Sequence, residues 1–145
     1  MERGKEMSTP MRPELSPKNP YWIERHRYYE LKHFCLQYPY WKKMYGYLDG
    51  YARRQISGGP IPHAGEQSRP TENVSERLIF YADRMHMVEQ TAKKASPELG
   101  TYIFKAVTQE YSYDQLNARE TIPAGKDMYY AAYRRFFWLL SRERG

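Results

Sequence analysis

Between residues 74 and 95, apolar side chains recur at alternating intervals of four and three residues. This spacing places them along one side of an α-helix, because residues three and four apart are neighbours on a helix surface. A seam of this length also needs a second helix to cover it. We therefore expect an all-α protein whose longest helix, over residues 72–95, packs against another helix of this chain or of a second copy. The seam consists of Val74, Leu78, Tyr81, Met85, Val88, Ala92 and Ala95.

Two shorter helices are predicted before this one. The first covers residues 21–37, with Asn19 as its N-cap and Pro20 at its first position. The second begins at Pro39, because a proline disfavours the α conformation in the residue before it, and it continues to Arg54. Two helices joined in this way form an N-terminal helical hairpin.

Composition divides the chain into four segments. Residues 1–19 are polar, carry three prolines and have no periodicity, so we expect a disordered tail. Residues 20–56 hold the hairpin. Residues 57–70 contain three glycines and three prolines, which is typical of a linker or exposed loop. Residues 71–145 then form a helical domain.

The end of this domain carries the pattern of a helix-turn-helix. A helix is expected over residues 97–108. Ser112 opens an S-x-x-Q capping box, which predicts a short helix over 113–119. A break containing proline and glycine follows at 121–125. The last helix is predicted from Gly125 to Arg142.

This last helix has two different sides. One side is an apolar stripe at helical spacing, which predicts burial. The other side combines basic, polar and small residues near the helix start, as a helix that lies in a DNA major groove requires. The apolar stripe comprises Tyr129, Tyr133, Phe136, Phe137 and Leu140. The polar side comprises Lys126, Asp127, Tyr130, Ala131 and Arg134.

The charge of the chain favours an acidic partner. The formal net charge is +6 and the sequence pI is about 9.3, which is typical of proteins that bind nucleic acid. Both ends are basic: residues 1–56 hold eleven Lys/Arg against six Asp/Glu, and residues 119–145 hold six against three. Arginine also pairs bidentately with phosphate and guanine. The predicted DNA-contacting residues are Lys126, Asp127, Tyr130, Arg134, Arg135, Arg119 and Arg142.

Three stretches of the C-terminal region resemble a known family. They are SYDQL at 112–116, IPAGKDMYY at 122–130 and YRRFFWLL at 133–140. Together they are similar to the RinA/ArpU-like late transcriptional regulators encoded in prophages of Gram-positive bacteria. The resemblance covers about the last 45 residues. It implies a helix-turn-helix like the promoter-binding region of sigma factors, with Lys126, Asp127, Tyr130 and Arg134 facing DNA.

The N-terminal hairpin carries a second basic and aromatic cluster. Eleven aromatic residues lie between Tyr21 and Tyr51, interleaved with lysine and arginine. Platforms for single-stranded nucleic acid have a similar composition. Aromatic residues spread around two helices are also ordinary core and surface residues, so the sequence leaves open whether this cluster binds nucleic acid or protein.

Other chemistry has little support in the sequence. His26, His33 and Cys35 do not share a helix face, so no metal site is expected. No phosphate-binding glycine loop or catalytic motif occurs, and we expect no cofactor and no enzymatic activity. Cys35 is the only cysteine, and no apolar run is long enough to span a membrane. These features predict a location in the host cytoplasm without membrane contact.

We therefore expect a DNA-binding transcriptional regulator of phage type, with double-stranded DNA as its partner and a possible homodimer through residues 72–95. Two alternatives remain open. One is a DNA-packaging protein resembling a small terminase subunit. The other is a phage inhibitor, of the anti-CRISPR kind, that binds RNA polymerase or another host nucleic-acid enzyme.

Overall fold

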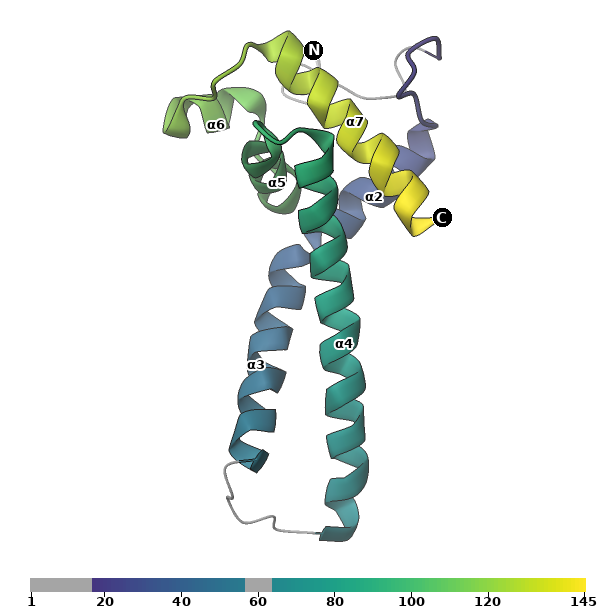
Figure 1. Ribbon diagram of the computed structural model, residues 1–145, viewed down its shortest axis with the longest axis vertical. Coiled ribbons are helices and arrows are strands. Elements are labelled where there is room, and N and C mark those ends of the chain that lie inside the picture. The colour runs from purple at the N-terminus through teal and green to yellow at the C-terminus, as the bar shows by residue number, and fades with distance from the viewer. Residues whose placement is uncertain (1–16, 57–63) are drawn as a thin grey trace, which may run out of the picture. The chain divides into compact units, whose positions relative to one another are not determined.

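The computed structural model describes residues 17–56 and 64–145 (Figure 1). All regular structure within these ranges is helical, which confirms the predicted all-α class. The predicted tail lies outside the described residues up to residue 16, as do residues 57–63 of the predicted loop. No helix in the described ranges is long and apolar enough to cross a membrane. The helices are α2 (Arg25–Leu36), α3 (Tyr38–Ile56), α4 (Ala64–Ala95), α5 (Gly100–Gln109), α6 (Tyr113–Glu120) and α7 (Lys126–Arg144).

The chain divides into two compact units. Unit 1 comprises residues up to Gln37 together with Met87–Gly145, and unit 2 comprises Tyr38–His86. Helix α4 contributes its N-terminal part to unit 2 and its last residues to unit 1.

In unit 2, α3 and the first part of α4 lie side by side (Figure 1). Trp41 and Leu48 of α3 are buried, as are Val74 and Tyr81 of α4. The helix predicted to begin at residue 72 begins eight residues earlier, at Ala64. The predicted helix was too short because the glycine and proline residues of this stretch indicated a loop. Most of its other residues are compatible with a helix.

Five of the seven seam residues of α4 are buried, and Leu78 and Met85 are half-buried. Val74 and Tyr81 are buried in unit 2, and Val88, Ala92 and Ala95 are buried in unit 1. These five side chains are already removed from water within one chain. The homodimer through this helix stays a prediction.

Unit 1 is built around α7. Helix α2 packs against both α5 and α7. The rings of Tyr28 on α2 and Phe137 on α7 meet edge to face, with centroids 5.0 Å apart. Burying such aromatic pairs is a large source of stability in a core. The whole predicted stripe of α7 is buried, and Phe136, Phe137 and Leu140 are fully enclosed.

Helix α2 begins four residues later than predicted. The side chain of Asn19 accepts a hydrogen bond from the Tyr21 amide at 2.8 Å, but this closes a turn. The helix is capped instead by Glu24, whose carboxylate accepts from the amides of His26 and Arg27. The predicted Asn19 cap is therefore wrong, because asparagine stabilises turns through the same kind of bond.

Helix α5 also begins later than predicted. Ser96 accepts a hydrogen bond from the Leu99 amide at 3.0 Å, as an N-cap would. Residues 97–99 nevertheless form a turn, and the helix begins at Gly100. A Cβ atom at Gly100 would lie 2.7 Å from the carbonyl oxygen of Ala92, so the end of α4 and the start of α5 pack backbone to backbone here.

Candidate nucleic-acid interface

The first helix of the candidate interface, α6, is fixed at its start by a capping box. The Ser112 hydroxyl accepts from the Gln115 amide at 3.2 Å, and the Gln115 side chain accepts from the Ser112 amide at 2.8 Å. The predicted capping box is confirmed. The helix then buries Tyr113 and Leu116, and a pair between Lys105 and Glu120 joins its C-terminal end to α5 at 2.6 Å.

The turn between α6 and α7 is held by side chains. Thr121 ends α6 in the left-handed conformation, with φ of 55°. The Asn117 side chain accepts from the amide of Ile122 at 2.8 Å, and Ile122 is buried. The Tyr113 hydroxyl donates to the carbonyl of Ala124 at 2.7 Å. Because these contacts fix both ends of the turn, the start of α7 has a defined direction relative to α6.

A group of tyrosines lies behind the start of α7. Tyr130 is buried, and its hydroxyl accepts a 3.4 Å hydrogen bond from the amide of Tyr113. Deeper in the core, the hydroxyls of Tyr133 and Tyr28 are 3.0 Å apart. Burial raises the pKa of Tyr129, Tyr130 and Tyr133 above that of an ordinary tyrosine. These phenols therefore remain neutral and structural at physiological pH.

The prediction that Tyr130 lies on the outer side of α7 is wrong. Tyr130 precedes Phe137 by seven residues, and two helical turns bring the two positions within about 20° of each other. Phe137 belongs to the buried stripe, so Tyr130 lies at the edge of that stripe and packs against α6. The seven-residue spacing was present in the sequence, but the predicted stripe did not include Tyr130.

Four residues in the first two turns of α7 are exposed. Lys126, Asp127, Met128 and Ala131 all face solvent, and Met128 retains 61% of its accessible surface. Lys126 lies 3.4 Å from the Asp114 carboxylate of α6. Both partners are largely exposed, so this ion pair contributes about 1 kcal/mol or less to stability. It can exchange for a contact with an external anion.

The predicted arginines occupy three places. Arg119 is exposed at the end of α6, with its guanidinium 5.1 Å from the ring of Tyr111. Arg134 and Arg135 are half-buried near the middle of α7, and Arg135 donates to the Tyr21 hydroxyl at 3.0 Å. Arg142 follows Lys126 by sixteen residues, or about 24 Å along the helix. The structure therefore does not bring Arg142 together with the start of α7.

Arg27 and Arg144 make contacts near the end of α7 that the sequence did not predict. Arg27 of α2 donates to the Ser141 hydroxyl at 3.0 Å and to the Ser141 carbonyl at 2.9 Å. Arg144 lies over the ring of Phe34, 3.9 Å from its centroid. These contacts join helices more than 100 residues apart in the chain, and no local pattern signals them.

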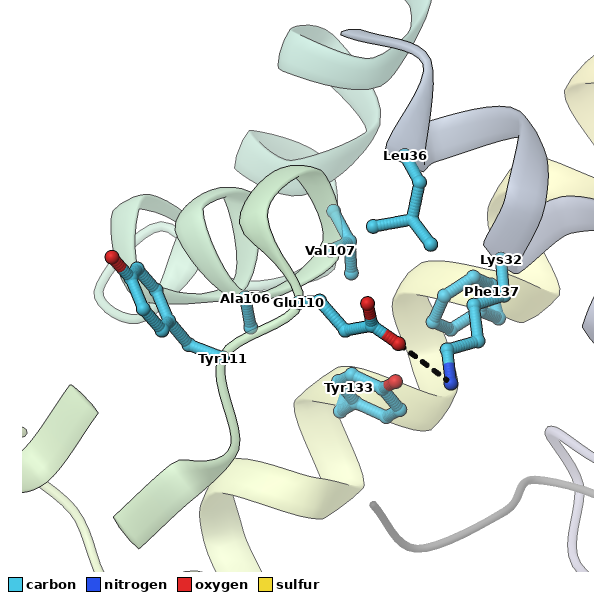
Figure 2. A pocket seen from close by; sticks show the side chains of 8 residues that line it. All are labelled: Lys32, Leu36, Ala106, Val107, Glu110, Tyr111, Tyr133 and Phe137. Atoms are coloured by element: carbon cyan, nitrogen blue, oxygen red, sulfur yellow. Dashed lines mark ion pairs between the residues drawn. The ribbon is translucent and has the colours of Figure 1, made fainter. Parts of the chain in front are cut away.

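A small hollow lies among α2, α5 and α7 of unit 1 (Figure 2). Lys32 and Glu110 form an ion pair across it at 3.7 Å, and Tyr133 and Phe137 form part of its lining. The space is too small for more than about one water molecule. Within the part of the chain that the structure describes, no group of three potential metal ligands comes together. Burial raises the pKa of the Cys35 thiol, which keeps it unreactive.

Comparisons with protein-family models, with curated proteins and with solved structures give no match for this chain. The interface is therefore interpreted from its own residues.

Proposed function

We propose that the protein binds duplex DNA through α6 and α7, arranged as a helix-turn-helix, and that it acts as a transcriptional regulator of the phage type its sequence resembles. The observation that carries this proposal is the division of α7 into a fully buried stripe and an exposed first turn, joined to α6 by a hydrogen-bonded turn. A helix that enters a major groove needs this combination of rigid support and open surface.

Three of the four exposed residues at the start of α7 would have a suitable partner on DNA. Lys126 would bind a phosphate or a guanine edge, and Asp127 would accept a hydrogen bond from a cytosine amino group. Ala131 is small enough to allow close approach, and its methyl group suits a thymine methyl. Arg119, at the end of α6, would neutralise a neighbouring phosphate. Tyr130 would act from behind, by holding α7 against α6.

The proposal predicts that Lys126→Ala weakens binding to the specific duplex by about five-fold or more, because one direct contact contributes ~1–3 kcal/mol. We would measure fluorescence anisotropy with a duplex from the flanking locus and a scrambled duplex, across a salt series. The control is Lys94→Ala, which removes the same charge from an exposed position on α4. If both variants lost the same affinity for both duplexes, binding would reflect general electrostatic attraction alone. That result would contradict the proposal.

A further inference from the structure

Unit 2 leaves large aromatic side chains in contact with water. Tyr47 retains 69% of its accessible surface, Tyr40 55% and Phe80 46%. By contrast, Trp41 and Tyr81 of the same unit are buried. A unit of two helices has one interface in which to bury apolar groups, and these three rings lie outside it. Exposed aromatic groups that lie close together indicate a binding surface.

The exposed rings of Tyr40 and Phe80 both contact the ring of Tyr81. Tyr40 and Tyr47 are seven residues apart, so they lie on the same side of α3, separated by about 10 Å along the axis. The ring of Tyr81 connects this side to α4: its centroid lies 6.2 Å from that of Tyr40 and 5.3 Å from that of Phe80. We call Tyr40, Tyr47 and Phe80, together with Arg77 and Arg84 described next, the aromatic face of unit 2.

Arginine side chains lie beside these rings, and Glu76 and Asp83 of α4 also lie within one turn of Phe80. The guanidinium of Arg84 lies over the ring of Phe80, 3.6 Å from its centroid. Arg77 precedes Tyr81 by four residues, so it lies on the same side of α4 as Tyr81, whose hydrogen bond raises the pKa of Tyr40. Helix α3 itself holds four Lys/Arg against one acid, Asp49, which is 2.9 Å from Arg53. A partner for this face must therefore accept both aromatic stacking and positive charge.

We propose that the aromatic face of unit 2 binds single-stranded nucleic acid, with unpaired bases stacked on Tyr40, Tyr47 and Phe80 and phosphates near Arg77 and Arg84. Paired bases in a duplex hide their flat surfaces within the stack, so rings of this kind can stack only on unpaired bases. A second copy of this chain is the competing occupant, and the oligomeric state measured in the test separates the two. This binding is independent of the proposed contact between α7 and duplex DNA.

The test uses the full-length protein and fluorescein-labelled oligothymidylate and oligouridylate of about 20 nucleotides, long enough to cover such a face. We expect both to bind, with Tyr47→Ala and Phe80→Ala each weakening binding at least about five-fold. The matched control is Ile79→Ala. Ile79 is 60% exposed and precedes Phe80 directly, so it points about 100° away on α4, and its loss should not change binding. Circular dichroism checks that every variant remains folded.

Different outcomes separate this inference from the duplex-binding proposal. If both are right, Lys126→Ala weakens binding to duplex only, and Tyr47→Ala weakens binding to single strands only. Oligonucleotide binding that is unchanged in Tyr47→Ala and Phe80→Ala would overturn the inference. It would also be overturned if light scattering showed that these substitutions convert a dimer to a monomer without affecting oligonucleotide binding, since the face would then join two copies. Binding of only one of the two oligonucleotides would assign the face to DNA or to RNA.

Discussion

Two glycines show how differently the same residue type can act. Gly100 lies where a Cβ atom would come within 2.7 Å of the Ala92 carbonyl oxygen, whereas a Cβ atom at Gly46 would meet nothing within 4 Å. We expect Gly100→Ala to lower the free energy of unfolding by about 1–3 kcal/mol, because backbone would have to move. Gly46→Ala should raise it by about 0.5–1 kcal/mol, since alanine favours a helix interior.

Urea denaturation of Gly100→Ala and Gly46→Ala, monitored by circular dichroism, measures both changes in the free energy of unfolding. A Gly100→Ala protein as stable as the wild type would mean that α4 and α5 do not approach each other as closely as described.

Local sequence patterns predict the surroundings of some residues of the interface but not of others. The exposure of Asp127 follows from its place away from the apolar stripe of α7, whereas Lys126 lies in line with the stripe, seven residues before Tyr133, and is exposed at the first residue of the helix. The positions of Arg135 and Arg142 do not follow from it. Arg135 bonds to Tyr21, and Arg142 lies 4.8 Å from the ring centroid of Trp138. Such contacts depend on which helix packs beside α7, and helical periodicity carries no information about that neighbour.

At the scale of one element, α6 depends on its cap. It has only eight residues, so its own backbone hydrogen bonds stabilise it weakly. We expect Ser112→Ala to lower the free energy of unfolding by about 1 kcal/mol, because the Gln115 amide loses its acceptor. Ser75→Ala, at an exposed position inside α4, is the control and should change stability by no more than a few tenths of a kcal/mol.

The same Ser112 variant links the cap to the proposed function. If α6 supports α7 on DNA, Ser112→Ala should also weaken duplex binding in the anisotropy assay, although Ser112 is not among the proposed DNA contacts. Full duplex affinity together with reduced stability would mean that α7 can bind without the support of α6.

Helix boundaries were predictable to different degrees. The start of α6 was predicted correctly because a capping box is a local arrangement of four residues. The starts of α2 and α4 were not, for opposite reasons. Asn19 can close a turn as well as cap a helix, so α2 begins only at Arg25. For α4, the glycine and proline residues near its start indicated a loop, but the helix extends back to Ala64.

At the scale of the whole molecule, the buried tyrosines predict sensitivity to alkaline pH. The pKa of Tyr129, Tyr130 and Tyr133 is raised in the folded protein by burial, whereas an unfolded tyrosine has a pKa of about 10. Their stabilising contribution is fully present below that value. Above about pH 10 the unfolded chain releases protons that the fold retains, so stability should fall by about 1.4 kcal/mol per pH unit for each tyrosine that stays protonated.

Urea denaturation at a series of pH values up to about pH 11 measures this loss of stability. Tyr133→Phe removes one of the titrating groups, so its stability should fall less steeply with pH than that of the wild type. Parallel pH dependence in the two proteins would show that Tyr133 does not contribute to the effect.

The sequence by itself determined the helical class, the apolar stripe of α7 and the capping box of α6. Each of these is decided by residues within a few turns of one another, where helical geometry fixes the neighbours. Only the tertiary structure decided that Tyr130 is buried against α6, that five of the seven seam residues of α4 are buried, and that Tyr40, Tyr47 and Phe80 stay exposed. These outcomes depend on which helices pack together, and that choice is made by contacts distant in the sequence.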